Sequence, residues 1–201
     1  MITRIAVLLT LAFVCCACSK NSAPVGAAQT ASTPARSSAQ SSLNTAGEFR
    51  TTVPTGWTAE KPTSDMRVAQ YKLPRADGDN QDALLVVYYF GQGQGGSPQA
   101  NIDRWINQIK QPDGSSSQER AKTETIKVNG LEVNTVDVSG NYSGGMSPDS
   151  APADSKSIYR LRGAVVDTPK GSYFVKLTGP EKTISHWDQA YRDYLNSFEF
   201  K

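Results

Sequence analysis

Two kinds of hydrophobic pattern divide the region from residue 47 to residue 201 into strands and helices. Residues 83–90 (ALLVVYYF) are apolar throughout, which predicts a central strand covered on both faces. Asn129-Gly130 predicts a tight hairpin turn, because this pair tolerates positive φ at both central positions. Alternating residues around Pro54-Thr55-Gly56 predict a hairpin-like start. The expected strands are 49–53, 67–73, 83–90, 123–128, 131–138, 158–166 and 173–177.

Two segments carry apolar residues three and four positions apart, the spacing of one helical face. The first opens at Ser97-Pro98, which suits an N-cap followed by a first helical residue, and is expected to end near residue 111. The second covers residues 187–198. Two amphipathic helices among six or seven mostly hairpin-linked strands predict an α+β domain, an antiparallel sheet with the helices packed on it, and not a doubly wound fold.

Several short stretches of this region resemble a family of uncharacterised exported bacterial proteins. They are Val53-Pro54-x-Gly56-Trp57, Tyr88-Tyr89-Phe90-Gly91, Asn101-Ile102-x-Arg104-Trp105 and Leu177-Thr178-Gly179-Pro180-Glu181. The resemblance covers the whole of residues 47–201. More distantly, the order of elements looks like the PsbP fold, which implies an α/β/α sandwich used mainly for docking to other proteins. No metal-binding or partner-binding residue is carried over from PsbP.

The N-terminus has the pattern of a secretory signal. A basic start is followed by the apolar run 5–14 and a cysteine-rich patch at 15–18. That run is shorter than the roughly 20 residues of a membrane-spanning helix. Ala17-Cys18 resembles a bacterial lipobox, which implies acylation of Cys18, palmitate included, and an anchor in membrane lipid; Cys15 departs from the usual leucine. Two alternatives stay open: modification of Cys16, or ordinary cleavage near residue 27 that gives a secreted protein without an anchor.

These observations divide the chain into three parts. Residues 1–17 are the expected signal peptide, residues 18–46 a lipidated N-terminus with a disordered tether, and residues 47–201 one domain. The tether consists of Ser, Ala, Thr, Gln and Pro with almost no large apolar residue, so it cannot repay the entropy of ordering. By resemblance to lipoproteins, Ser19 after the cysteine favours the periplasmic face of the outer membrane if the cell is Gram-negative. The expected location is therefore the cell envelope.

Charge and cysteine content limit the functions that the chain can have. The chain has 21 Lys plus Arg against 19 Asp plus Glu, in no long run of one sign, which argues against nucleic acid as a partner. All three cysteines lie in the N-terminal patch, so the domain has no thiol for a disulfide, a nucleophile or a metal site. We expect a non-catalytic module that binds an envelope protein or another envelope component. The alternative is an exported hydrolase that uses carboxylates and hydroxyls.

One glycine motif has the context of a phosphate-binding turn. Gly91, Gly93 and Gly96 follow a strand and precede a helix, whose N-terminal N–H groups attract phosphate. However, hairpins follow in place of a second βαβ unit, and Pro98 removes one donor. A flexible structural connection is the favoured interpretation, with no cofactor expected.

The polar stretch 140–157 is long for a loop in a compact domain. Tyr142 and Met146 are its candidate binding residues for a partner, and plain disorder is the alternative.

Other features have a structural interpretation that we prefer. Residues 77–82 (DGDNQD) resemble a calcium loop but lack the bidentate glutamate, which favours a solvated turn. His186 is the single histidine, so no histidine-rich metal site is expected, nor is catalysis by this residue. Trp57, Trp105 and Trp187 are expected to fill the core and not to form a carbohydrate platform.

Overall fold

The computed structural model describes residues 41–43, 49–143 and 158–201. Residues 37–201 form one compact unit, and everything below concerns that unit. Cys18 and Met146 lie outside the described residues.

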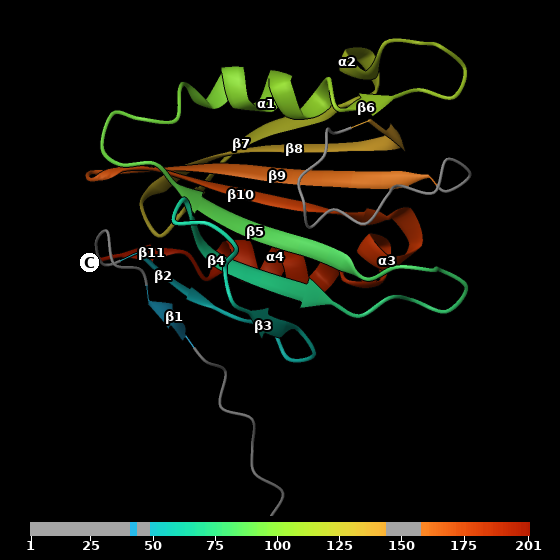
Figure 1. The fold of residues 1–201 in the computed structure, drawn as a ribbon. Coiled ribbons are helices and arrows are strands. Elements are labelled where there is room, and N and C mark those ends of the chain that lie inside the picture. The colour runs from blue at the N-terminus through green and yellow to red at the C-terminus, as the bar shows by residue number, and fades with distance from the viewer. Residues whose placement is uncertain (1–40, 44–48, 144–157) are drawn as a thin grey trace, which may run out of the picture. The chain divides into compact units, whose positions relative to one another are not determined.

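The main element of this unit is an eight-stranded antiparallel sheet (Figure 1). Two of its hairpins have tight turns, with positive φ at Asn129-Gly130 in one and at Gly171 in the other. The strand order is β3 (Thr58–Glu60), β4 (Arg67–Leu73), β5 (Ala83–Tyr89), β10 (Gly171–Pro180), β9 (Tyr159–Thr168), β8 (Leu131–Tyr142) and β6 (Ile109–Lys110), and β7 (Lys122–Val128) also pairs with β8.

A small second sheet contains the start and the end of the domain. It has the order β1 (Ser41–Leu43), β2 (Phe49–Thr52) and β11 (Glu199–Phe200). The expected hairpin-like start is therefore wrong: β2 does not pair with β3, which joins β4 in the main sheet. Packing of Phe49 favours the position of β2 in the small sheet. Its ring stacks on Tyr173, with centroids 4.2 Å apart, and contacts Phe198, with centroids 5.2 Å apart.

The helices agree with the two amphipathic segments but differ in their ends. The first, α1 (Pro98–Ile106), stops five residues before position 111, because Ile109 and Lys110 pair as β6 with the end of β8. The second predicted segment, 187–198, corresponds to α4 (Asp188–Asn196). A further helix that the pattern did not predict, α3 (Glu181–His186), precedes it and is separated from it at Trp187 (φ −94°, ψ 10°). A short helix, α2 (Ser117–Arg120), precedes β7.

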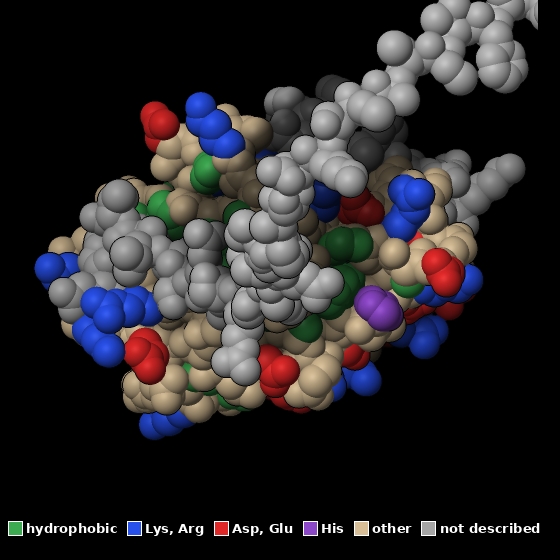
Figure 2. All heavy atoms as spheres, turned by 90° about the horizontal axis from the view of Figure 1, so that it is seen from below, with side chains coloured by type: hydrophobic (Ala, Val, Ile, Leu, Met, Phe, Trp, Pro, Cys, Tyr) green, Lys and Arg blue, Asp and Glu red, His purple; other side chains and the backbone are tan. Residues whose placement is uncertain are grey.

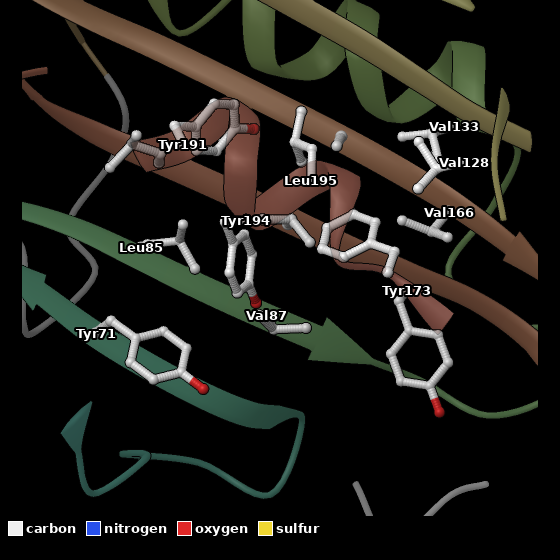
Figure 3. Close-up of a cluster of buried hydrophobic side chains, with 14 of the residues drawn as sticks. Tyr71, Leu85, Val87, Val128, Val133, Val166, Tyr173, Tyr191, Tyr194 and Leu195 are labelled. Carbon is white, nitrogen blue, oxygen red and sulfur yellow. The ribbon is translucent and has the colours of Figure 1, made fainter. Parts of the chain in front are cut away.

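The helices pack on opposite faces of the sheet, and each face has its own core. Along β9, Leu161 and Val165 pack with α1, whereas Ala164 and Val166 belong to the core under α3 and α4. On the α4 face, Tyr191, Tyr194 and Leu195 contact side chains that rise from β5 and neighbouring strands (Figure 3). The predicted α+β class, an antiparallel sheet with helices packed on it, is confirmed.

The α1 face is only partly covered by its helix. Helix α1 packs on β8 and β9, at one side of the sheet. On β4 and β5 the cover of the same face is uneven: Lys72 is exposed, and Leu84 and Tyr88 are half-buried. Gln70 and Val86, which pair with each other between these positions, are buried. This difference in cover places a polar surface beside the helix, and the candidate site lies there.

Candidate functional site

Lys176 occupies the centre of the sheet on the α1 face. Strand β10 lies between β5 and β9, and its alternate residues Val175 and Leu177 point into the α4-face core. Lys176 therefore points to the opposite side, where its Nζ donates to Gln108 Oε1 at 2.6 Å and to the Tyr142 hydroxyl at 3.2 Å. The ammonium also lies 5.4 Å from the centroid of the Tyr142 ring.

The surroundings of Lys176 disfavour its positive charge. Burial, and then the charges of Arg104 and Arg67, lower the pKa of this lysine to about 8. Its two hydrogen-bond acceptors, from Gln108 and Tyr142, are neutral groups. A half-buried lysine held by neutral partners and next to two arginines is an uncommon arrangement for a purely structural residue.

Arg104 is held above this part of the sheet by a buried asparagine. Its Nη2 donates to Asn101 Oδ1, and Asn101 is 2% exposed. The Asn101 amide in turn donates to the carbonyls of Gly95 and Ser97, at 2.8 and 2.9 Å. Because the side-chain nitrogen of Asn101 donates to these two carbonyls, its Oδ1 has a fixed position as the acceptor for the Arg104 guanidinium.

Arg67 approaches from the far side, at the start of β4. It donates to Gln70 Oε1 at 2.8 Å and lies 5.8 Å from the centroid of the Tyr88 ring. Gln70 donates to Glu60 Oε2 at 3.1 Å, and Glu60 also lines a cavity beside this region, together with Asp82. We call the set Arg67, Tyr88, Arg104, Gln108, Tyr142 and Lys176 the cation–aromatic cluster.

A cavity of about 360 Å³ adjoins the cluster, and Tyr142 belongs to both. The Tyr142 ring stacks on Tyr159 with centroids 5.8 Å apart, and the Tyr159 hydroxyl donates to Gln81 Oε1 at 2.7 Å. Burial raises the pKa of Tyr142, with Tyr88 and Tyr159 adding to the effect. The Tyr142 hydroxyl therefore keeps its proton and can donate a hydrogen bond at neutral pH.

The opposite face carries a second polar cluster, whose charges compensate one another. Arg160 binds Asp137 of β8 at 2.5 Å and Asp188 of α4 at 3.1 Å, while Arg162 binds Asp188 at 2.8 Å. The hydrogen bond to Asp137, together with the two acidic charges, raises the pKa of Arg160 despite its burial. Arg162 also lies 4.4 Å from the centroid of the Tyr191 ring. This network ties β8 and β9 to α4.

A cleft of about 310 Å³ lies beside this network. Asp137 lines it, and so do Arg162 and Tyr191. Because both carboxylates of the network already accept hydrogen bonds from arginine, the arrangement is that of a structural clamp and not of a general acid with its base.

The glycine loop packs as a tight connection. Gly91, Gly93 and Gly96 have φ of 103°, 71° and 82°, in the left-handed region that favours glycine. At the helix start the Ala100 N–H donates to Ser97 Oγ at 3.2 Å. These contacts favour the structural interpretation, and a phosphate role for this loop stays a prediction.

The two candidate binding residues of the long polar stretch differ in outcome. Tyr142 lies at the end of β8, paired with Ile109, and is half-buried. The expected loop start at Gly140 is wrong, because β8 continues to Tyr142. Met146 and the lipidation candidate Cys18 lie outside the described residues.

The remaining candidates take structural places. In the acidic loop, Asp79 Oδ2 accepts hydrogen bonds from the Thr183 N–H at 2.8 Å and the Thr183 hydroxyl at 2.6 Å.

His186 is exposed and meets Trp187 edge-on. Trp57 and Trp105 are buried, as expected for core residues. Within the described residues, no group of three His, Cys, Asp or Glu side chains is placed to hold a metal ion.

Sequence reasoning missed Arg67, Arg104 and Lys176. A lysine within the apolar strand 173–177 was the available signal. On the face shown in Figure 2, basic and acidic side chains are interspersed. In the part of the chain that the structure describes, no helix is long and apolar enough to cross a membrane.

Comparison with known proteins shows the fold and not the family. No family model matches the chain, and no curated protein matches it. Among solved structures, LpqN of Mycobacterium tuberculosis, described as involved in cell envelope biogenesis, has a TM-score of 0.51 at 11% identity, covering 76% of this chain and 83% of that one. A Pseudomonas aeruginosa protein of unknown function, PA94, a putative regulator by its description, gives 0.45 at 14%, covering 72% and 97%. A Bacteroides thetaiotaomicron protein gives 0.42 at 9%, and the match covers 76% of this chain and 45% of that one. The chain thus has a fold similar to that of LpqN.

Proposed function

We propose that this chain is an exported, lipid-anchored and non-catalytic binding module of the cell envelope. Its domain presents the α1 face of the sheet to an anionic partner, while acylated Cys18 holds the chain at the membrane. Residues 19–36 form the tether, with a root-mean-square span of roughly 23 Å if flexible, so the domain reaches partners away from the bilayer surface. The tether is shorter than the expected 18–46, because Ser41–Leu43 pair with β2 in the small sheet.

The observation that carries the binding role is the cation–aromatic cluster beside an incompletely covered face. Its three cations come from three elements, α1, β4 and β10, and two tyrosines lie among them. Tyrosine and arginine are enriched where proteins bind their partners. A positively charged surface of this kind complements an anionic partner.

Two resemblances support the envelope setting. The sandwich of helices on an antiparallel sheet resembles the PsbP-like arrangement, which serves mainly for docking. LpqN, similar in fold alone, is described as involved in cell envelope biogenesis.

Glu60 and Asp82 line the cavity of about 360 Å³, and they are the carboxylate pair that the hydrolase alternative would use. Glu60 accepts from the Gln70 amide and Asp82 from the Arg75 N–H, which favours a structural role for both. Asp137 and Asp188 likewise both bind Arg160.

Fractionation of cells tests the anchor. Cys18→Ser is expected to move the chain from the membrane fraction to the soluble exported fraction, because acyl chains contribute about 0.8 kcal/mol per buried methylene. Globomycin, which blocks lipoprotein maturation, should stop processing of the unmodified chain. Cys16→Ser is the matched control and should fractionate normally; release by Cys16→Ser alone would assign the lipid to that residue, and membrane association unaffected by either change would refute the anchor.

Hydrogen exchange tests the binding face. Solubilised envelope is added to the full chain, and protection is expected at β10 and at the end of α1, with no change on α4. Lys176→Met should abolish that protection. Protection confined to α4, or none at all, would refute the binding role of the α1 face.

A further inference from the structure

We propose that the cation–aromatic cluster binds a phosphate group, with Arg104, Lys176 and the Tyr142 hydroxyl contacting its oxygens. This inference rests on the proposed function and names the chemistry of the anionic partner.

The first argument is that, among the residues that the structure describes, no acidic side chain forms an ion pair with Lys176 or Arg104. The contacts of its ammonium are the Gln108 amide oxygen and the Tyr142 hydroxyl, both neutral. Arg104 likewise binds a neutral acceptor, the Asn101 amide oxygen. Like charges repel more strongly in a half-buried site than in water, so the arrangement is unfavourable until an anion enters it. Burial lowers the pKa of Lys176 most, and the charges of Arg104 and Arg67 lower it further.

The second argument is the direction of the donors. Lys176 lies on the floor formed by β10, Arg104 comes from the helix, and Tyr142 comes from the end of β8. Lys176 Nζ lies 3.2 Å from the Tyr142 hydroxyl, and Arg104 lies near enough for its charge to lower the pKa of Lys176. Donors from three elements suit a tetrahedral anion, whereas a planar carboxylate is met best by one bidentate arginine. A phosphate monoester carries a charge of about −1.5 to −2 at neutral pH, which matches several cations.

The cavity next to the cluster provides space for the part of the ligand that carries the phosphate group. Its volume of about 360 Å³ is within the range of small-molecule sites. The stacked rings of Tyr142 and Tyr159 line it. Its charged lining is mixed, with Glu60 and Asp82 beside Lys72 and Arg75, so a substituent with polar or cationic groups suits it better than a second anionic group. Because Tyr142 belongs to both places, a phosphate in the cluster would carry its substituent into this cavity.

Titration of the full-length chain with phosphate tests the proposal. Inorganic phosphate and glycerol 3-phosphate are the probes, acetate at equal ionic strength is the carboxylate comparison, and calorimetry with amide chemical shifts is the readout. Saturable binding of both phosphates is expected, with shifts at Lys176 and Gln108. Arg104→Gln and Lys176→Met should each weaken binding roughly tenfold, because each removes a charged hydrogen bond.

Arg192→Gln is the matched control, since Arg192 is also an exposed helical arginine but lies in α4. It should bind phosphate as the unmodified chain does. Circular dichroism establishes that each variant is folded, and the exposed Arg104 provides a test even if Lys176→Met unfolds the domain.

A second arm identifies the source of the phosphate. The Cys18→Ser chain, which has no anchor at that cysteine, is sedimented with phosphatidylglycerol vesicles. Co-sedimentation that Arg104→Gln abolishes would assign a lipid head group, and soluble phosphate binding without co-sedimentation would assign a soluble ligand. Failure in both arms, or acetate binding as tightly as phosphate, would overturn the inference. Protection of the α1 face by envelope material would then still leave the proposed function standing.

Discussion

Trp105 of α1 packs directly against Gly163 of β9, and this contact determines how closely the helix approaches the sheet. A Cβ atom at position 163 would overlap the indole ring and reach Val136 Cγ1 at 3.0 Å. Gly163 is also the register partner of Lys176. The missing side chain therefore gives the tryptophan its space and brings the helix end, with Gln108, to the lysine.

Gly163→Ala should destabilise the domain by about 1–3 kcal/mol, because overpacking forces Trp105 and the helix outwards. The midpoint of urea unfolding measures the loss. In a Trp105→Leu background the same change should cost clearly less, because a smaller side chain leaves room for the methyl group. Equal costs in both backgrounds would show that the indole contact is not the cause.

Arg160→Met should lower the free energy of unfolding by about 1–3 kcal/mol, because it removes charged hydrogen bonds to Asp137 and Asp188. Urea denaturation measures the loss. Arg120→Met is the matched control: Arg120 also binds an aspartate, Asp113, but both side chains are more than half exposed. The control should leave the unfolding midpoint unchanged. A similar effect of the two changes would contradict the structural role of the Arg160 network.

The lowered pKa of Lys176 predicts a rise in stability with pH. The pKa is about 8 in the folded chain against the ordinary value of 10.5, so between these values the unfolded chain binds more protons. Stability should therefore increase from about pH 8 towards pH 10. The groups that face this ammonium are Arg67, Arg104, Tyr88 and Tyr142.

Urea unfolding at several pH values measures this effect. Lys176→Met should flatten the profile in that window, whereas a parallel profile would exclude this lysine as the cause. Above pH 10 the opposite trend is expected, because burial raises the pKa of Tyr173 to about 12 in the folded chain and the unfolded tyrosine loses its proton first.

Asp79 acts as the cap of α3 from a distant loop. Helix α3 begins after Pro180, which provides no side-chain cap, and Asp79 accepts from the Thr183 N–H instead. Asp79→Ala should therefore cost about 1 kcal/mol, and the exposed Asp77→Ala close to none. Thermal unfolding measures both. Calcium should leave the midpoint unchanged, and a clear increase with calcium would restore the metal interpretation of this loop.

The hydrophobic pattern predicted most of the secondary structure, because periodicity depends on local sequence alone. The apolar run around Leu85 and the Asn129-Gly130 turn appear in the structure as β5 and the β7–β8 hairpin. The short strands β3 and β6 escaped prediction, since two or three residues carry no periodicity. Helix α1 ends early for a similar reason: Ile109 continues the helical spacing, but pairing with Tyr142 takes it into the sheet.

Tyr142 is the one residue of the candidate site that the sequence pattern predicted, and the pattern did not predict its position in a strand. The sequence placed this residue in a polar stretch, whereas the structure places it at a strand end, in contact with Lys176. Lys176 and Arg67 are more than one hundred residues apart in sequence, so their approach depends on strands β4, β5 and β10 lying side by side. No local pattern records such a pairing.

The sequence by itself determined the class of the domain, the two amphipathic helices and the absence of thiols after residue 18, because each depends on composition or on short-range spacing. Only the tertiary structure decided which charges meet. It brought Arg160 and Arg162 to aspartates on one face and left Lys176 with neutral partners on the other. The physical reason is that alternate residues of a strand point to opposite faces, while the charges opposite each of them come from distant elements.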